Sequence, residues 1–241
     1  MKISAPTALE PDSVQLDRAA NDASDHQCLG KTAGRPRAAD KQARLESLLH
    51  TAACLFLEKG YSKVSLEMIA REAHVAVRTI YVKFGGKAGL LNAVIAEGRA
   101  RFFAGMSSMD TDTRPMEEVL ADFGLRFLGL VSAPAFVKLH RMVIAEAHTT
   151  PELATTFNQA GPQQTREQLS RFFARPEIKA QLRTEVPHEA LAVHLINCLL
   201  GDQLSRVLFA ADAPPTPEEN QRRVARGLDL FLNGVRRPAR D

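Results

Sequence analysis

The densest group of side chains with recognisable chemistry lies in segment 77–84. Arg78, Thr79 and Lys83 stand there among apolar residues, and a helix over this segment would expose them opposite its apolar face. Arg and Lys donate hydrogen bonds to the edge of guanine, and Thr can contact the methyl group of thymine or bond to a phosphate. These residue types therefore predict a surface that recognises nucleic acid.

Two short helices joined by a tight turn must position these side chains. The apolar spacing predicts one helix over 66–73, with Ser65 as its N-cap, and another over 77–83, with Glu72–Val75 as the turn between them. A longer helix, which ends at Gly60, precedes the pair. The arrangement is typical of a helix-turn-helix module, whose second helix enters the major groove while the first braces the backbone.

Segment 44–90 resembles the DNA-binding domain of the tetracycline-repressor (TetR) family. The match includes the end of the first helix, Phe56–Tyr61, and the later positions Val64, Ser65, Ile69, Ala70, Ala73, Val75, Thr79, Tyr81, Phe84, Lys87, Leu90 and Leu91. The resemblance implies that Tyr81 and Lys87 contact the phosphate backbone. The predicted DNA-binding residues are Lys63, Ser65, Val77, Arg78, Thr79, Tyr81, Lys83 and Lys87. Tyr81 can also lay its ring against the core, and core packing is the preferred interpretation of Phe84.

Three departures from the family pattern predict a less rigid head. His74 occupies the turn position where the family has glycine, which requires a left-handed backbone at some energetic cost. Ala76 replaces the usual serine, so the second short helix lacks its preferred N-cap, at a cost of about 1 kcal/mol. Gly85–Gly86 and Gly89 predict a loose junction with the helix that follows.

The positive charge of the chain is concentrated around this module. Segment 35–87 holds ten Lys and Arg residues against five acids, whereas segment 88–241 holds eighteen of each. Residues 1–34 are slightly acidic, with three basic and five acidic residues. Phosphate contacts supply most non-specific DNA affinity, so this distribution suits a polyanionic partner of the module alone.

The whole chain is predicted to be all-α: a three-helix head with the helix-turn-helix, followed by a larger helical ligand-binding and dimerisation domain. The predicted boundaries are 1–38 for a disordered, basic-ended arm, 39–86 for the head and 87–235 for the larger domain. Gly34–Arg37 is either a solvated linker or an arm whose Arg enters a minor groove. Helices after the head are predicted at about 87–107, 115–131, 134–148, 151–160, 162–175, 188–210 and 217–235, with breaks at Pro and Gly positions.

The larger domain more loosely resembles the multidrug-efflux and AefR-like branch of the family, on Arg141–Ala147, Pro151–Ala154 and Gly161–Pro162. The resemblance implies a ligand pocket, and the predicted ligand-binding residues are Phe102, Phe103, Phe123, Phe127, His140, Arg141, Glu146 and Asn197, with Phe136 and Phe157 as further aromatic candidates. Residue by residue, simple core packing of the phenylalanines is the stronger interpretation. Arg141 and Glu146 could equally form a structural ion pair.

The last two helices predict a homodimer. One broad apolar face consists of Leu191, His194, Leu195, Cys198, Leu199, Leu208 and Phe209, and another of Val224, Leu228, Phe231 and Leu232. Two such helices from each subunit could form a four-helix bundle, although both faces could instead be internal core.

The sequence predicts neither an enzyme nor a cofactor or metal site. Gly85–Lys87 lacks the spacing and the upstream strand of a phosphate-binding loop, and His140 and His148 are eight residues apart rather than four. Cys28, Cys54 and Cys198 lack metal-ligand spacing and are interpreted as reduced thiols, with redox sensing at Cys54 or Cys198 as the alternative. The absence of a spanning apolar run or a signal peptide predicts a cytoplasmic protein with no membrane partner.

These features together predict a homodimeric repressor that binds a palindromic operator in double-stranded DNA and is released by a small, largely apolar effector. Movement of the helix over about 87–107 would change the separation of the two heads. The alternative is an architectural or ligand-independent DNA-binding protein, against which the large neutral domain argues.

Overall fold

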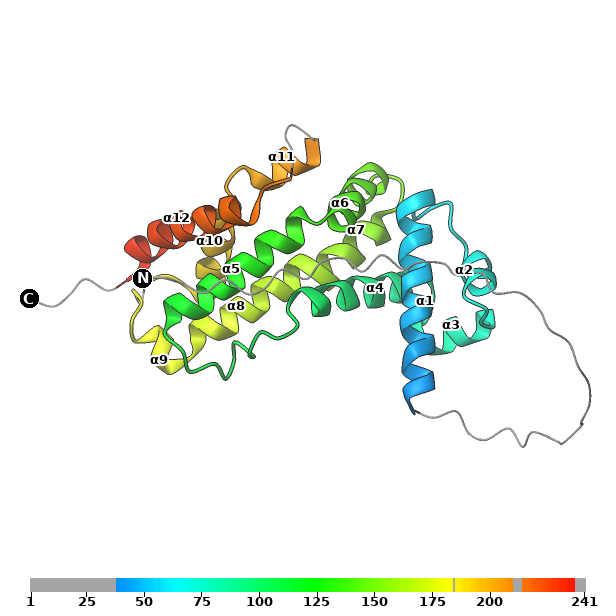
Figure 1. Cartoon of the computed structure of the whole chain (residues 1–241), viewed down its shortest axis with the longest axis horizontal. Helices are drawn as coiled ribbons and strands as arrows, with labels where there is room; N and C mark the ends of the chain where they lie inside the picture. Colours follow the sequence, from blue (N-terminus) through cyan, green and yellow to red (C-terminus); the bar gives the residue numbers. More distant parts are fainter. Residues whose placement is uncertain (1–37, 184, 210–213, 237–241) are drawn as a thin grey trace, which may run out of the picture. The chain divides into compact units, whose positions relative to one another are not determined.

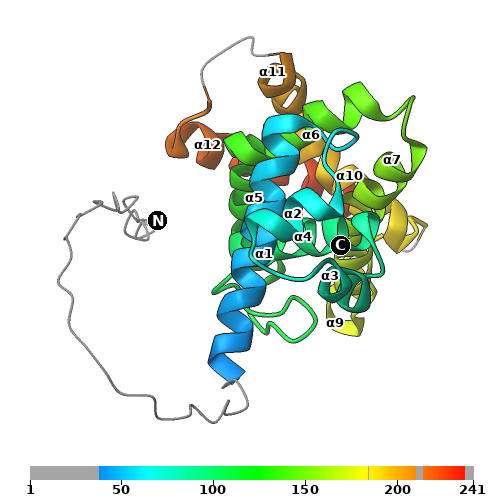
Figure 2. The ribbon, with the colours of Figure 1, turned by 90° about the vertical axis from the view of Figure 1, so that its right-hand side faces the viewer.

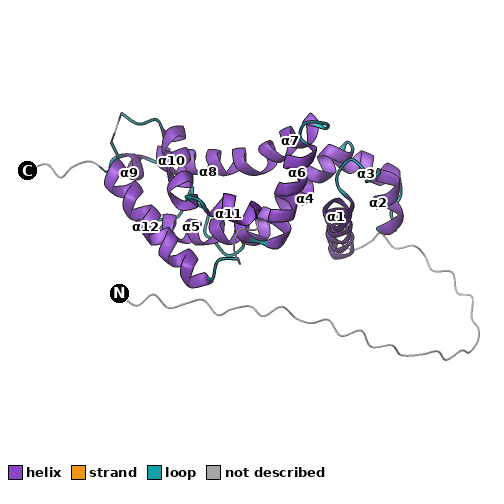
Figure 3. Cartoon of the chain, turned by 90° about the horizontal axis from the view of Figure 1, so that it is seen from above, coloured by secondary structure: helices purple, strands orange, loops and turns teal. Residues whose placement is uncertain are grey.

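The computed structural model describes residues 38–183, 185–209 and 214–236, and within these ranges the chain is helical (Figures 1 and 3). Their one pair of bridged residues, Leu182 and Arg236, belongs to no strand. The all-α prediction is therefore confirmed. The predicted arm over 1–38 lies outside the described residues, except for Ala38 at the start of the first helix.

The head consists of α1 (Ala38–Lys59), α2 (Leu66–Glu72) and α3 (Val77–Phe84), which face the viewer in Figure 2. Each helix directs an apolar stripe inward, and α1 contacts both α2 and α4 (Lys87–Phe102). The fully buried members of this stripe include Ala52, Ile69 and Ile80. Within each helix, apolar residues recur every three or four positions, and this spacing predicts the helix.

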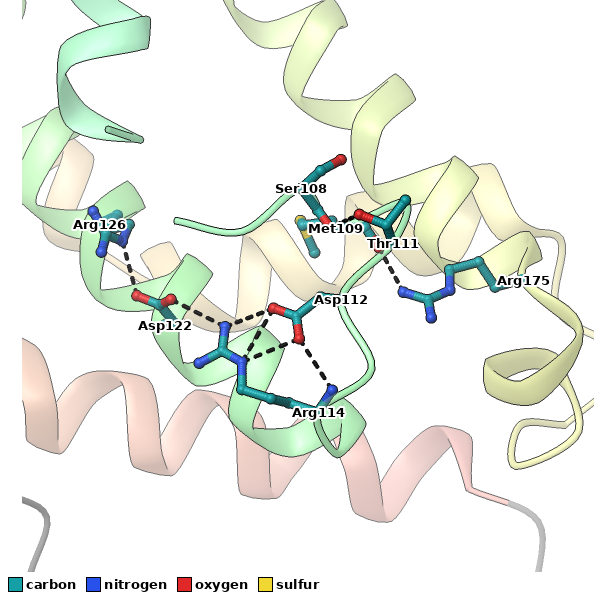
Figure 4. A network of polar contacts seen from close by, with 8 residues as sticks. All are labelled: Ser108, Met109, Thr111, Asp112, Arg114, Asp122, Arg126 and Arg175. Carbon is teal, nitrogen blue, oxygen red and sulfur yellow. Dashed lines mark hydrogen bonds and ion pairs between the residues drawn. The ribbon is translucent and has the colours of Figure 1, made fainter. Parts of the chain in front are cut away.

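The helix predicted to run to about residue 107 ends earlier, at Phe102. The loop that follows is held by an ion-pair network on α5 (Met116–Ser132) and by Arg175 (Figure 4). Arg114 donates to both carboxylate oxygens of the buried Asp112, with Nη2–Oδ2 at 2.7 Å, and Arg175 donates to the carbonyl of Met109 at 2.6 Å. The hydrogen bonds from Arg114 lower the pKa of Asp112 below its ordinary value. The C-terminal end of α4 is therefore attached to a fixed loop.

The remaining helices form the larger body. They are α6 (Pro134–Glu146), α7 (Pro151–Asn158), α8 (Gln164–Ala174), α9 (Pro176–Lys179), α10 (His188–Leu200), α11 (Gln203–Phe209) and α12 (Pro217–Val235). Proline stands at the start of α6, α7, α9 and α12, where its missing N–H costs nothing.

Two predicted boundaries in the body are wrong. The helix expected over 188–210 is interrupted at Gly201, which has a φ of 48°, so that α10 and α11 are separate. Conversely, helical structure continues through Gly161–Pro162, because a π-helical segment, Gln159–Gln163, connects α7 to α8. The wider turn of a π-helix accommodates the ring of Pro162, which would clash with the preceding turn of a regular α-helix.

Most residues predicted to form the dimer surface are internal core instead. Leu191, Leu195 and Leu199 of α10 pack with Val224, Leu228, Phe231 and Leu232 of α12 inside the body, together with residues of α5 and α8. The sequence pattern marks only which face of a helix is apolar, and both helices satisfy that face within one chain. Of the predicted set, His194 and Phe209 are exposed.

The head and body do not have separate cores at the predicted boundary of residue 86. The apolar cluster of the head continues into α6 and α7, through Val143, Leu153, Phe157 and Ala160. A second cluster occupies the far part of the body, between α5, α8, α10 and α12. The first turns of α4 and the helices α6 and α7 of the body thus share one apolar core with the head.

Among the described residues, no single helix has the length and apolar composition needed to cross a bilayer. The helices α5 and α6 meet that criterion only as a pair, bent by 63°.

Candidate DNA-binding helix and ligand cavity

Apart from Tyr81, the side chains of α3 are arranged as the sequence predicts. Ile80 is completely buried and anchors the helix, whereas Arg78, Thr79 and Lys83 are exposed. Tyr81 is 54% exposed and Val82 78%, so the ring of Tyr81 stands in solvent rather than against the core. Phe84 is half-buried against the head cluster, as expected. The free surface of α3 therefore presents two cations, a hydroxyl and a phenol.

The turn before α3 matches the expectations for its unusual residues. His74 adopts a φ of 53°, the left-handed conformation that glycine would adopt without cost. Ala76 precedes α3 without a side-chain cap, whereas the hydroxyl of Ser65 accepts a hydrogen bond from the amide of Met68 at 3.2 Å. Ser65 is thus occupied as an N-cap, and Val77 packs against the core. Lys63 is exposed beside them.

The junction between α3 and α4 is close-packed, which corrects the prediction that its glycines make it loose. A Cβ atom at Gly89 would lie 1.8 Å from the carbonyl oxygen of Phe84. Gly85 and Gly86 have φ values of 76° and 139°, which reverse the chain between the two helices. Gly89 thus permits a close approach of the two backbones, while Gly85 and Gly86 permit the positive φ values of the turn, and α3 is tightly coupled to α4.

A carboxylate of the body holds the loop between α1 and α2. Glu146, at the end of α6, accepts hydrogen bonds from the amides of Tyr61 and Ser62 at 3.0 and 2.8 Å, and from the hydroxyl of Ser62. The ammonium of Lys87 lies 4.2 Å from the centroid of the Tyr61 ring. We call Glu146, Tyr61, Ser62 and Lys87 the head–body joint. Glu146, predicted as a ligand contact, lies in this joint.

The three titratable groups of the joint have pKa values that are shifted in different directions. Partial burial acts to raise the pKa of Glu146, but the hydrogen bonds from Ser62 and Tyr61 and the charge of Lys87 outweigh it, so that the pKa is lowered. Burial, with Glu152 and Glu146 nearby, raises the pKa of Tyr61 to about 12. Burial also lowers the pKa of Lys87, against the opposite effect of the two glutamates.

A largely apolar cavity of about 560 Å³ is bounded by α1, α4, α5, α6, α7, the π-helical segment and the start of α8, with contributions from α10 and α11. Of the predicted ligand-binding residues, Phe102, Phe127 and His140 line it, together with the further candidates Phe136 and Phe157. Its volume is within the range of about 300–1,000 Å³ that is usual for small-molecule sites.

The other predicted ligand residues lie elsewhere. Phe123 is completely buried in the body core, where its ring stacks on that of Phe103 at 5.8 Å. Arg141 donates to the carbonyls of Leu208 and Val207 at the end of α11, rather than to Glu146. Asn197 is exposed on α10. The phenylalanines could not be separated by sequence, because filling a core and lining a cavity require the same residue type and spacing.

Sequence reasoning missed Arg99 and Thr165, which line the cavity from α4 and α8. The Nη2 atom of Arg99 donates to the hydroxyl of Thr165 at 3.4 Å. A signal existed, because Arg99 follows Leu91 and Ile95 at four-residue intervals and so belongs to the apolar face of its helix. Burial lowers the pKa of Arg99.

His140 is enclosed by aromatic rings on the opposite wall. Its ring centroid lies 5.4 Å from that of Phe136 and 5.0 Å from that of Phe157. Burial lowers the pKa of His140, which keeps the ring neutral at pH 7. Its buried Nδ1 atom has no hydrogen-bond partner within the described residues.

The thiols show no metal site. In the described part of the chain, no group of three or more His, Cys, Asp or Glu side chains could hold a metal ion. Cys54 lies 3.7 Å from Nε2 of His50 at the cavity wall, and burial raises the pKa of Cys198. A raised pKa disfavours the reactive thiolate at Cys198. Cys28 lies outside the described residues.

A helix-turn-helix head on a larger helical body defines a DNA-binding transcriptional regulator. Residues 48–94 match the family model described as bacterial regulatory proteins of the tetR family, and residues 118–234 match the C-terminal domain of AefR-like transcriptional repressors. The chain therefore belongs to the TetR family of transcriptional regulators, with a body of the AefR-like type. Both resemblances seen in the sequence are confirmed, and the members of this family are regulators rather than enzymes.

Known proteins agree with this assignment. The chain is 25% identical over 181 residues to the HTH-type transcriptional repressor ComR of Escherichia coli strain K12, covering 72% of this chain and 82% of ComR. The fold is similar to that of the flavonoid-responsive regulator FrrA, with a TM-score of 0.65 at 24% identity, over 82% of this chain and 100% of FrrA. It is also similar to a TetR transcriptional regulator from Agrobacterium tumefaciens, with a TM-score of 0.62 at 20% identity, over 80% and 94% of the two chains.

Proposed function

We propose that the protein is a homodimeric repressor that binds a palindromic operator and is released from it by a small, largely apolar ligand. The cavity carries this proposal, because its wall includes Leu49 and Phe56 of α1 as well as residues of the body. A ligand in it would touch the helix on which the DNA-binding module is built. Such contacts give a ligand the differential affinity that a conformational change requires.

For DNA contact we propose that Arg78, Thr79 and Lys83 reach base edges in the major groove. Their exposure on α3 supports this role. Tyr81, Lys63 and Lys87 would contact phosphates, Lys87 from the first turn of α4, where its ammonium is already half-buried against Tyr61. Ser65 and Val77 would act by holding α2 and α3 in place.

For release we propose that the ligand moves α4 and α6 together. Gly98 and Phe102 of α4 line the cavity, while the other end of α4 packs on α3 at Gly89. His140 of α6 lines the cavity, while Glu146 of the same helix bonds to the head. Both helices thus join the cavity to the module, and a small rotation of either would change the separation of two heads.

For dimerisation we propose the outer faces of the last helices. Helix-turn-helix heads usually bind palindromes as dimers. The residues Val193, His194 and Asn197 of α10 and Leu230 of α12 are exposed, Leu230 by 68%. An analytical ultracentrifuge would test this, since a monomer at micromolar concentration would contradict the proposal.

Footprinting on the DNA upstream of the gene and its neighbours tests the proposal as a whole. A repressor should protect a short palindrome, whereas an architectural protein would protect no discrete site.

Arg78→Ala should weaken operator binding by about 1–3 kcal/mol, and Lys138→Ala, which removes an exposed charge from α6, should not. Tyr81→Phe with Lys87→Ala should reduce the salt dependence of binding, and an unchanged salt slope would exclude both as phosphate contacts.

A further inference from the structure

The charged groups around the cavity are unequal in number. Three arginines, Arg99, Arg101 and Arg166, line it, against a single carboxylate, Glu97. Glu97 is already paired with Arg101 at 3.1 Å, and the side chain of Arg101 is 61% exposed at the rim. The cavity therefore carries excess positive charge, while most of its wall is apolar.

Arg99 contributes to this excess charge, because it has no charged partner among the described residues. Its Nε atom is buried and has no hydrogen-bond partner within the described residues. Its Nη2 atom reaches only the neutral hydroxyl of Thr165, and its guanidinium lies 5.9 Å from the centroid of the Phe103 ring. No carboxylate forms an ion pair with Arg99 in the described part of the chain.

Arg99 is partly buried, and a cation withdrawn from water without a counter-charge is costly, so that proteins normally pair it. Thr165 cannot supply that charge, because its hydroxyl is neutral; it donates to the carbonyl of Gly161 at 3.2 Å and accepts from Arg99. A ligand in the cavity that Arg99 lines can therefore supply the missing counter-charge. A planar guanidinium matches a carboxylate in shape and bonds to it through two parallel N–H groups.

We propose that the ligand of this cavity is an apolar molecule bearing one carboxylate, and that Arg99 binds the carboxylate while the phenylalanines enclose the apolar body. This inference rests on the proposed function, because it names the chemical class of the effector. The Arg99 side of the cavity, between α4 and α8, holds the charged end. Phe102, Phe127, Phe136 and Phe157 supply the apolar wall.

Calorimetric titration of the full chain with matched acids and alcohols tests the inference. The probes are decanoate with decanol, below the critical micelle concentration, and 2-naphthoate with 2-naphthalenemethanol. At least one acid should bind about tenfold more tightly than its alcohol, because an ionised partner strengthens the hydrogen bonds of Arg99. Arg99→Gln should remove this preference, Arg99→Lys should recover part of it, and Lys138→Gln should leave it intact.

The outcomes separate this inference from the proposed function. If both alcohols bind as tightly as their acids, or if Arg99→Gln keeps the preference while the protein remains folded by circular dichroism, the carboxylate assignment is wrong and the cavity can still be an effector site. If neither acids nor alcohols bind, the assignment and the ligand-responsive function both fail. If Arg99→Gln unfolds the protein, the inference is tested instead by the ratio of acid to alcohol affinity in the unmodified chain and in the Arg99→Lys variant.

Discussion

The DNA-binding helix and the ligand cavity present arginine in opposite settings. Arg78 stands exposed on α3, where it is free to meet a polyanion, while Arg99 is enclosed in a largely apolar wall. The first setting depends on a few neighbouring residues, because a short amphipathic helix exposes one side whatever it packs against. The second depends on helices from all parts of the chain. Local structure thus builds the DNA-binding surface, and tertiary structure builds the cavity.

If the DNA-binding surface depends on local backbone geometry, the largest effect should come from the α3–α4 junction. Gly89→Ala places a methyl group 1.8 Å from the carbonyl oxygen of Phe84, so we expect the free energy of unfolding to fall by about 3 kcal/mol. Gly98→Ala in the same helix meets no atom within 4 Å and should raise it by about 0.5–1 kcal/mol through helix propensity. Urea denaturation measures both. Equal effects of the two variants would contradict the close-packed junction.

The joint at Glu146 tests whether the two regions are energetically coupled. Glu146→Gln weakens the bonds to the amides of Tyr61 and Ser62, and we expect a loss of about 2 kcal/mol in the free energy of unfolding. Hydrogen exchange of these two amides should accelerate. The control is Glu189→Gln, which neutralises an exposed carboxylate at the start of α10, away from the joint. If exchange at Tyr61 and Ser62 is unchanged, head and body are independent at this point.

The loop after α4 gives a prediction that depends on pH. Asp112 has a lowered pKa because Arg114 donates hydrogen bonds to it, so its ionised form stabilises the fold. This stabilisation is present above the ordinary pKa of 3.8 and is lost as the pH falls through the lower folded value. At pH 7, Asp112→Asn should lower the free energy of unfolding by about 1.5 kcal/mol. The difference between the two proteins should shrink below about pH 4, and a constant difference would contradict the role of the charge.

The smallest expected effects compare the two helix starts of the module. Ser65→Ala removes the N-cap of α2 and should cost about 1 kcal/mol. Ala76→Ser supplies the cap that α3 lacks and should add about 0.5–1 kcal/mol, since the backbone there is already extended, with φ −72° and ψ 140°. Thermal unfolding followed by circular dichroism measures both. Opposite signs are expected, and a destabilising Ala76→Ser would show that position 76 serves another purpose.

The sequence was most informative where a residue type has one structural meaning. Ser65 before α2, His74 in the turn and the apolar spacing of α3 all predicted the observed geometry, because each acts on its immediate neighbours. The helix-turn-helix and its exposed residues followed from these features. The family resemblance then extended the prediction to the body.

The sequence was least informative where a residue type has two meanings. Phe123 and Phe127 lie one helical turn apart, yet only Phe127 reaches the cavity. Gly89 suggested looseness and instead permits a close contact with Phe84, because a glycine in sequence does not say whether another backbone approaches it. Likewise, the apolar faces of α10 and α12 did not reveal whether a neighbour in the same chain or a second copy would cover them.

The continuity of the head cluster into α6 and α7 limits how this regulator can be recombined with others. In a chimera that joins residues up to 86 to the body of another regulator, part of the apolar surface of the head would face residues that do not pack against it. Val143, Leu153 and Phe157 would have to travel with the head, and so would Glu146, to keep the loop after α1 in place. The exchangeable unit of specificity is therefore larger than the DNA-binding segment and is discontinuous along the chain.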